Sequence, residues 1–231
     1  RRSPDLSMSP RTRMLAGFLT ANIAIIAVAA LILLNRSEQP PQIQGVLLPQ
    51  ARELPAFSLL DHHDQTFTNA NLKGRWHLLS YGFTTCPDIC TTTLAQLTTV
   101  SRELQEQGRT DLEVLFYSVD HRRDTVAQMA SYVPFFDPGF IGLTHLDDVG
   151  NPHLPFEQGL GIVAQLVPVI GPDVDPADNE YEVNHGVTLF LINPEGALQA
   201  IFQPDRGPLG THTFNADTVL RDYLAIRSYL G

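Results

Sequence analysis

The longest apolar run of the chain lies near its beginning. Met14 to Leu34 holds 21 residues without a formal charge, and at about 1.5 Å per helical residue this run would extend about 31 Å, the hydrocarbon thickness of a bilayer. A cleaved signal peptide has a shorter apolar region, about 7–15 residues, that ends in small residues, whereas this run ends LILLNRSE. The pattern therefore predicts one uncleaved transmembrane helix.

The residues that flank this helix predict its orientation and the organisation of the chain. Four arginines and a single aspartate precede it, and the positive-inside tendency keeps such a tail in the cytoplasm, so that everything after the helix is exported. The segment SEQPPQIQGVLLPQ then has no sustained period and suits a tether. We expect four parts: a cytoplasmic tail (1–13), a transmembrane anchor (14–34), a linker (35–50) and one exported domain (51–231).

Short apolar runs in the exported part predict strands that alternate with helices. AFSLL and QTFTN flank the turn-prone DHHD and indicate a hairpin. Trp76–Phe83 and Leu112–Asp120 are typical of buried strands, and the apolar spacing of three and four between them predicts a helix that ends at Gly108. Asp124 is expected to cap the following helix, TVAQMASYV.

The second half of the domain closes with two strands and a helix. Val187–Asn193, a Pro-Glu-Gly turn and ALQAIF form a predicted strand pair, and ADTVLRDYLAIRSYL is a predicted helix capped by Asn215. The prolines between Gln165 and Glu182 indicate an inserted surface loop or hairpin. Because strands joined by a tight turn are antiparallel, we predict an α/β fold with a mixed sheet flanked by helices.

Composition and charge narrow the class of partner. The whole chain is 43% hydrophobic and 17% charged, which is ordinary for a globular protein. Residues 35–231 carry 11 Lys or Arg and 24 Asp or Glu, a formal net charge of −13. An acidic surface without a basic stripe repels phosphate backbones, so nucleic acid is not expected as a partner.

Both cysteines of the chain lie in YGFTTCPDIC, residues 81–90. In an oxidising compartment the ordinary expectation is a structural disulfide, but a bridge from Cys86 to Cys90 would close a very short loop, which restricts the unfolded chain least. The pair stands where an apolar strand gives way to a helix, with Pro87 suited to the first helical position. A helix N-terminus favours thiolate over thiol, and a separation of four puts both side chains on one helical face, so a functional pair is favoured.

The spacing leaves redox exchange and metal binding open. Dedicated thiol oxidoreductases more often have two residues between their cysteines, and the three found here suit two ligands of one ion, although CxxxC can still close a disulfide. Two thiolates with one imidazole would favour copper, particularly Cu(I). A structural zinc site would usually have four protein ligands.

Eight histidines are candidates for a third ligand. His62 and His63 in the DHHD turn are expected to be exposed, and His77 to be packed within a strand. The other loop histidines are each expected to be surface groups: His121, His145, His153 and His212. His185 differs because it stands immediately before an apolar strand, and strand ends are common positions for site residues in α/β folds. Pattern alone ranks His185 modestly ahead of the others.

Several segments, in the right order over much of residues 50–230, resemble the Sco/SenC family of copper proteins. GFTTCPDIC is similar to the family's GFTxCPDxCP. SVDHRRDTVAQMASYV followed by FDPGFIGLT resembles SVDPxRDTP…YV…FDPxFIGLT, and VNHGVTLFLINPEG resembles VDHSxxxxLxxPxG. The resemblance implies a thioredoxin-like domain, tethered to a membrane by one helix, that assists copper delivery to cytochrome c oxidase.

By residue, the resemblance places the family's copper ligands on Cys86, Cys90 and His185, with Cu(I) as the bound ion and Cu(II) as a second state. It implies a bacterial inner-membrane protein whose domain lies in the periplasm. The implied partners are the copper-site subunit of cytochrome c oxidase, other copper chaperones and thiol reductants. The alternative is a periplasmic thiol–disulfide reductase or redox sensor that acts on cysteines of an oxidase subunit. Thioredoxins have a cis-proline where this chain has Val187, and its absence favours metal handling.

Other residues also match or depart from the family's motifs. We expect Asp88 to support the metal site or a partner contact, or to cap the helix start, and the matching charges of Asp120, Arg123 and Asp124 to form structural ion pairs. The departures are Thr91, His121 and Val126 in place of prolines, and Asn184 in place of an aspartate. A neutral amide would orient a ligand histidine less strongly than a carboxylate. None of the departures removes a ligand.

Overall fold

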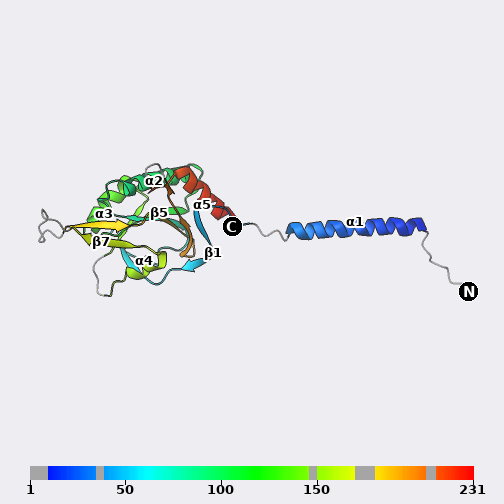
Figure 1. Ribbon diagram of the computed structural model, residues 1–231, viewed down its shortest axis with the longest axis horizontal. Coiled ribbons are helices and arrows are strands. Elements are labelled where there is room, and N and C mark those ends of the chain that lie inside the picture. Colours follow the sequence, from blue (N-terminus) through cyan, green and yellow to red (C-terminus); the bar gives the residue numbers. More distant parts are fainter. Residues whose placement is uncertain (1–9, 35–38, 146–149, 170–179, 207–211) are drawn as a thin grey trace, which may run out of the picture. The chain divides into compact units, whose positions relative to one another are not determined.

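The structure is a computed structural model that describes residues 10–34, 39–145, 150–169, 180–206 and 212–231 (Figure 1). The chain divides into two compact units, Arg1–Gln39 and Pro40–Gly231. In the first unit the structure describes one long helix and the final residue of the unit, Gln39. The second unit is a sheet flanked by helices.

The first unit contains the apolar helix α1 (Pro10–Leu34). Its window Arg13–Leu31 has a mean hydropathy of 2.2 and no buried residue, so by length and composition it is able to cross a membrane, as a signal sequence would be. Two polar side chains bond to the backbone of the helix itself. Thr20 donates to the carbonyl of Gly17 at 3.0 Å, and Asn22 donates to that of Phe18 at 2.8 Å. Such internal bonds lower the cost of placing polar groups in lipid.

The second unit is built on one eight-stranded sheet with the order β1-β10-β9-β4-β5-β6-β2-β3. β4, β5 and β6 are parallel, and the other pairings are antiparallel. The strands are β1 (Gly45–Glu53), β2 (Ser58–Asp61), β3 (Thr66–Thr68), β4 (Trp76–Gly82), β5 (Leu112–Ser118), β6 (Ile141–Thr144), β9 (Leu189–Ile192) and β10 (Ala197–Phe202). The predicted mixed sheet is confirmed.

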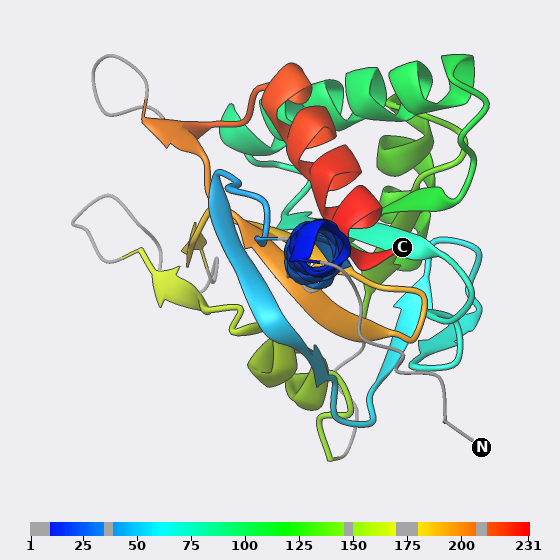
Figure 2. The same ribbon diagram turned by 90° about the vertical axis from the view of Figure 1, so that its right-hand side faces the viewer.

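Helices cover both faces of this sheet. On one face α2 (Ile89–Glu106) packs with α5 (Ala216–Leu230), accompanied by α3 (Val126–Tyr132) and the short helix η1 (Val133–Phe135). On the other face lies α4 (Leu154–Leu160). Figure 2 shows α5 in red in the upper part of the domain and α4 in yellow-green in the lower part.

The two core layers are separated by the alternation of side chains along the strands. In β5, Phe116 packs in the layer that contains α2 and α5, and Tyr117 packs in the layer that contains α4. Successive residues of a strand point to opposite faces, which is why neighbours in the sequence enter different layers. Side chains at the ends of the strands can therefore lie on either face of the sheet.

The predicted hairpins are present in the structure. β2 pairs with β3 and β9 with β10, as the patterns AFSLL/QTFTN and VTLFLIN/ALQAIF indicate. The proline-rich stretch begins and ends in the hairpin β7 (Ala164–Pro168) and β8 (Tyr181–His185), while residues 170–179 of that stretch lie outside the described residues. A further small pair is β11 (Asp205–Arg206) with β12 (His212–Thr213).

Strand β1 corrects the predicted linker. The predicted tether extends to Gln50, but residues 45–50 belong to β1, and Gly45, Val46 and Leu47 pair with β10. The register shifts between Leu47 and Arg52, and Pro49 interrupts the apolar alternation, as is tolerated only in an edge strand or at a bulge. No sustained period therefore marks the strand in the sequence. The backbone N–H of Gln44 donates to the buried Asp222 of α5 at 2.7 Å, which ties the start of β1 to the domain.

The predicted residues at the helix starts are correct for α5 and differ from the structure for α2 and α3. Asn215 caps α5 as predicted, because its side chain accepts a hydrogen bond from the N–H of Thr218 at 3.1 Å. The prediction that Asp124 caps α3 is wrong: Thr125 is the cap, and the carboxylate of Asp124 is buried and bound by other donors. Pro87 lies outside helix α2, which begins at Ile89.

Replacing Asn215 with alanine should lower the free energy of unfolding by about 1 kcal/mol, because the N–H of Thr218 loses its acceptor. Urea denaturation of the full chain in detergent, followed through the fluorescence of its single tryptophan, Trp76, measures this change. Ser228→Ala, at an exposed position of the same helix, is the matched control and should change the value by less than about 0.5 kcal/mol. Equal losses in the two variants would contradict the capping role.

Candidate metal centre

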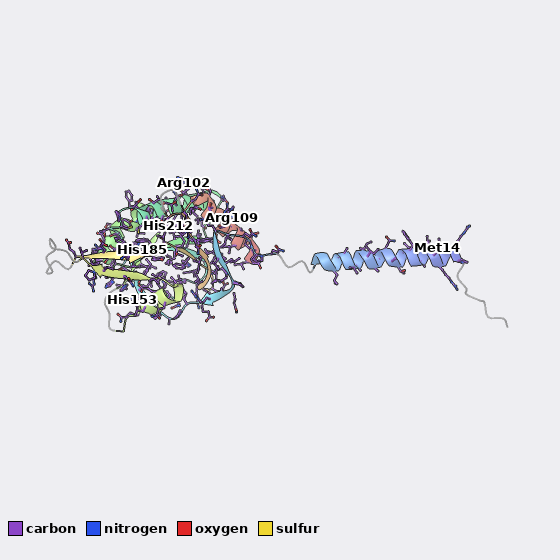
Figure 3. The ribbon with its side chains drawn as sticks, in the orientation of Figure 1. Met14, Arg102, Arg109, His153, His185 and His212 are labelled. Carbon is purple, nitrogen blue, oxygen red and sulfur yellow. The ribbon has the colours of Figure 1, made fainter. Side chains whose placement is uncertain are left out.

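Both cysteines and His185 converge at one end of the sheet, although they come from three segments. Cys86 lies in the loop after the carboxyl end of β4, Cys90 in the first turn of α2, and His185 is the last residue of β8. Their ligand atoms lie within 4.8 Å of one another, and Sγ of Cys90 is 3.9 Å from Nε2 of His185. Figure 3 labels His185 in this group, which we name the cysteine site.

The cysteine site is tightly packed and its sulfurs are reduced. Cys86 is 8% exposed and Cys90 is 3% exposed, and neither forms a disulfide. Gly82 at the end of β4 leaves the space for Cys90, because a Cβ on this glycine would lie 2.4 Å from the sulfur. Tyr81 and Phe83 each meet the ring of His185 edge-on, with centroids 5.7 Å apart. The imidazole is thus held against the sulfurs by two aromatic side chains.

The orientation of the His185 ring follows from its hydrogen bond to the backbone. Nδ1 is 2.6 Å from the carbonyl oxygen of Gly186. A carbonyl only accepts, so Nδ1 is the donor and carries a proton. Nε2 is then the atom that faces the sulfurs: it donates to Cys86 when the ring is charged, and it offers a lone pair to a metal ion when the ring is neutral.

The two thiols differ in their protonation. The hydrogen bond from the Cys90 thiol is the largest cause that lowers the pKa of Cys86; burial opposes it, and hydrogen bonds from His185 and from the N–H groups of Cys90 and Asp88 lower the pKa further. The same Cys86–Cys90 bond, together with burial, raises the pKa of Cys90. A thiolate is therefore favoured on Cys86 and disfavoured on Cys90. The helix N-terminus is expected to favour a thiolate, and this effect is outweighed at Cys90 by the hydrogen bond to Cys86 and by burial.

The cysteines reach this geometry without sharing a helical face. Since α2 begins at Ile89, Cys86 is not helical, and the predicted shared face does not exist. The loop turns back instead, with the N–H of Cys86 donating to the carbonyl of Phe83 at 3.2 Å. Asp88 stands at the N-cap position of α2 and is exposed, but its side chain makes no capping hydrogen bond.

Asp124 anchors the loop that carries Cys86. Its buried carboxylate accepts hydrogen bonds from the backbone N–H of Thr84 at 2.8 Å, from the hydroxyl of Thr84 at 2.6 Å and from the hydroxyl of Ser118 at 2.6 Å. The carboxylate thereby connects the ends of β4 and β5. This role is not visible in the local sequence, because an aspartate before a helix suits both a cap and a buried acceptor, and only the family motif around Arg123–Asp124 marks the position.

A second polar group positions the strand that carries His185. Asp120 is fully buried and forms the predicted ion pair with Arg123. Tyr181, at the start of β8, donates to Asp120 at 2.6 Å, and the guanidinium of Arg123 lies 4.4 Å from the centre of the Tyr181 ring and 5.7 Å from that of Phe83. Cation–π contacts of this kind add to the hydrogen bonds that fix β8 against the rest of the domain.

Asn184, which replaces the family's aspartate, does not reach the imidazole. It is exposed, and as the neighbour of His185 in β8 its side chain points to the opposite face of the strand. The carbonyl of Gly186 takes the place of a carboxylate as the partner of Nδ1. The substitution therefore leaves the orientation of the His185 ring intact.

The remaining histidines are more buried than the sequence predicted. His77 is buried as expected, and His63 and His212 are exposed. The expectation of surface positions is wrong for His62, His145 and His153, which are buried. The reason for His62 is a hydrogen bond that its Nδ1 accepts from the N–H of Gly142 in β6, 80 positions later in the chain. His145 and His153 stack on each other with ring centroids 3.5 Å apart.

The sequence model of the SCO1/SenC family matches residues 47–211, more than half of the chain. The chain belongs to the SCO1/SenC family. This confirms the resemblance that the motifs indicated. A similar protein, the putative copper-binding protein of Stutzerimonas stutzeri, is 35% identical to this SCO1/SenC chain over 78% of the chain and 85% of its own length. The mitochondrial SCO2 homologue of Bos taurus is 35% identical over 75% of the chain, which spans 61% of that longer protein.

Solved structures of relatives share the fold of this SCO1/SenC domain. Arabidopsis thaliana ScoI with copper bound is 28% identical and superposes with a TM-score of 0.61 over 76% of this chain and 99% of the other. BsSco, in which a disulfide switch was identified and which is described as a member of the Sco family of cytochrome c oxidase assembly proteins, is 20% identical with a TM-score of 0.55 over 80% of this chain and 96% of the other. The thioredoxin-like mixed sheet flanked by helices is confirmed.

Replacing Asp124 with alanine should lower the free energy of unfolding by about 2–4 kcal/mol, because three donors lose a buried, charged acceptor. Urea denaturation of the reduced full chain in detergent measures the loss. Asp88→Ala is the control, since this exposed carboxylate makes no capping bond and should contribute at most about 1 kcal/mol through the helix dipole. An Asp124→Ala variant as stable as Asp88→Ala would contradict the anchoring role.

Alkylation of Cys86 by iodoacetamide should proceed near its maximal rate at pH 6, where an ordinary thiol with a pKa of about 8.5 is almost fully protonated. The lowered pKa of Cys86 keeps it a thiolate as the pH falls, until the pH approaches that lowered value. Mass spectrometry of the modified peptide between pH 4 and 10 gives the midpoint. Cys90→Ala removes the largest cause and should move the midpoint up the furthest, with His185→Ala moving it less. A wild-type midpoint near 8.5 would show that the thiolate is absent.

Proposed function

We propose that this SCO1/SenC protein is a membrane-anchored copper chaperone. It binds one copper ion through Cys86, Cys90 and His185 and passes the ion to the copper-site subunit of cytochrome c oxidase during assembly. The observation that carries the proposal is the convergence of two sulfur atoms and one imidazole nitrogen within 4.8 Å. A relative named as a copper-binding protein and another reported as an oxidase assembly protein support the same assignment.

The spacing of the donors suits one small ion. With bonds of about 2.3 Å to sulfur and about 2.0 Å to nitrogen, as zinc makes to the same ligands, two donors at 120° around one ion stand about 3.7 Å apart. The distance of 3.9 Å between Sγ of Cys90 and Nε2 of His185 is close to this value. Two thiolates and an imidazole form a soft, low-coordinate set, which favours Cu(I) over zinc or any hard ion.

The shared proton of the cysteine pair links copper binding to proton release. In the free protein the proton on Cys90 is held by the Cys86 thiolate. A copper ion replaces that proton between the two sulfurs, so Cys90 becomes a ligand only as its proton leaves. The reverse step is equally direct, because thiols of an acceptor can displace the donor's sulfurs one at a time on an under-coordinated ion.

The same two thiols give the alternative function, a thiol–disulfide reductase or redox sensor acting on cysteines of an oxidase subunit. The lowered pKa of Cys86 favours this reading, because a thiolate beside a thiol is also the arrangement of a dithiol reductant. In that reaction the Cys86 thiolate attacks a disulfide of the partner, forms a mixed disulfide and releases one of the partner's sulfurs as a thiolate. Cys90 then loses its proton, bonds to the sulfur of Cys86 and releases the partner's second sulfur. Two electrons and the thiol proton thereby pass to the partner's cysteines. Oxidation of the pair to a disulfide would also remove both sulfur ligands, so copper loading requires the reduced protein.

The membrane anchor and the orientation are part of the proposal. Helix α1 has the length and hydropathy to cross a membrane, and the arginines that precede Met14 favour a cytoplasmic N-terminus. The domain of residues 40–231 would then lie in the periplasm, anchored to a bacterial inner membrane. There it meets the copper-site subunit of the oxidase, other copper chaperones and thiol reductants.

The full chain, reduced and kept anaerobic in detergent, should bind one equivalent of Cu(I) in competition with a chromophoric chelator. Loss of a direct ligand should exceed the 10–100-fold that outer-sphere changes typically cost, so Cys86→Ala and Cys90→Ala should weaken binding at least about 100-fold. His185→Ala should weaken it at least about tenfold. X-ray absorption should report two sulfur ligands and one nitrogen ligand.

His212→Ala is the matched control, because this exposed histidine lines the same open cavity of about 450 Å³ as His185. Its affinity should stay within about twofold of the parent's, which corresponds to less than about 0.5 kcal/mol. Unchanged Cu(I) affinity in both Cys86→Ala and His185→Ala would refute the assignment. Insulin reduction by the metal-free protein that persists in His185→Ala would favour the reductase instead.

A further inference from the structure

A second group of potential metal-ligating side chains lies at helix α4. His145 directly follows β6, His153 stands immediately before α4, and Glu157 lies within α4. One ring nitrogen of each histidine and one carboxylate oxygen of Glu157 lie within 4.8 Å of one another. Figure 3 labels His153 in this group, which we name the histidine site, apart from His185 in the cysteine site.

The two sites share no ligand residue, and their helices, α2 and α4, pack on opposite faces of the sheet. Tyr117 and Phe156, which border the histidine site, belong to the layer between the sheet and α4. Helix α2, whose first turn carries Cys90, packs in the opposite layer with α5. What the sites have in common is the edge of the sheet where the parallel strands end, because Cys86 follows β4 and His145 follows β6. In α/β folds this edge is where ligands usually bind.

Three imidazoles form a compact stack at the histidine site. The rings of His145 and His153 are nearly parallel, with centroids 3.5 Å apart and an interplanar angle of 12°. The ring of His121 lies on the other side of His145 at 4.1 Å. His145 is 5% exposed and His153 is 7% exposed. His121 stands where the family motif has a proline. This departure from the motif therefore lies at the histidine site and not at the cysteine site.

A carboxylate distinguishes this stack from ordinary aromatic packing. Glu157 is half-buried, and its Oε1 accepts a hydrogen bond from the hydroxyl of Tyr117 at 2.6 Å. Burial and the neighbouring Glu157 keep the pKa of Tyr117 well above its ordinary value, so the phenol remains a donor. A ligand carboxylate that is itself hydrogen-bonded by an outer group is the usual arrangement around protein-bound metal ions.

We propose that His145, His153 and Glu157, with His121 as a further donor, form a second metal site that takes a divalent transition-metal ion, Cu(II) or Zn(II). Imidazole and carboxylate donors suit these borderline ions, and Cu(II) binds a given set of such donors more tightly than Zn(II). Bonds of 2.0–2.1 Å in a tetrahedral site place ligand atoms about 3.4 Å apart, so the side chains close around the ion by at most about 1.5 Å. The two sites thus differ in softness: sulfur selects Cu(I), and the histidine site selects a divalent ion.

The test uses the full chain in detergent with Cys86→Ser and Cys90→Ser, which removes the cysteine site and makes the outcome independent of the chaperone proposal. This parent should bind one equivalent of Cu(II), with electron paramagnetic resonance showing nitrogen couplings, and one equivalent of Zn(II) by calorimetry. Adding His153→Gln should weaken both affinities at least about tenfold. Adding Glu157→Gln, whose amide oxygen can still accept from Tyr117, should weaken them less, because it removes charge and keeps the hydrogen bond.

His63→Gln is the matched control, because its exposed ring packs against that of His62 with centroids 4.0 Å apart and an interplanar angle of 42°, an imidazole pair elsewhere on the domain. It should leave both affinities within twofold. The thermal midpoint provides a second measurement, since metal should raise it in the parent and in His63→Gln but not in His153→Gln. If His153→Gln does not fold, Glu157→Gln decides between the outcomes.

Absence of Cu(II) and Zn(II) binding in the parent would overturn the proposal. So would loss of binding in His63→Gln with retention in His153→Gln, or equal binding in the parent, His153→Gln and Glu157→Gln. Tight Zn(II) binding with weaker Cu(II) binding would support the site and reverse the expected order of the two ions.

Discussion

The buried carboxylate of Asp124 is the interaction on which the arrangement of the cysteine site depends. It accepts hydrogen bonds from Thr84 in the loop after β4 and from Ser118 at the end of β5, and the backbone carbonyl of Asp124 accepts from the hydroxyl of Thr144 at the end of β6. One residue therefore connects the carboxyl ends of the three parallel strands. Because breaking such bonds would leave buried polar groups uncompensated, the loops that follow these strands begin from a rigid base.

Two donor sets of different chemistry extend from this base. The loop after β4 and the first turn of α2 bring two sulfurs to the imidazole at the end of β8, and the loops after β5 and β6 bring imidazoles to a carboxylate on α4. The cysteine pair favours a thiolate on Cys86 and a thiol on Cys90, so its affinity for a cation depends on both pH and redox state. The histidine site contains no thiol and is insensitive to disulfide formation. Together they would let one domain hold copper in two oxidation states, each with the donors that state prefers.

The elements with a strong local period were predictable from the sequence, and those set by distant contacts were not. β4 is mostly apolar and buried along its whole length, and α5 carries its capping residue next to its first turn. β1 escaped prediction because its partner, β10, is about 150 residues away and Pro49 breaks its alternation. Asp124 was mistaken for a cap because a short polar side chain before a helix suits both a cap and a buried acceptor.

The sequence by itself determined the elements with a strong local period, their alternation into a mixed sheet and, through the order of its motifs, which family the chain resembles. These properties depend on residues close together in the chain, whose periodicity and caps are visible without a structure. Only the tertiary structure decided that Nε2 of His185 faces the sulfurs, that Cys90 keeps its proton, and that His145 and His153 are buried beside Glu157. Protonation and burial are set by neighbours in space, and the residues that supply them, such as Cys90 and His185, stand up to 95 positions apart.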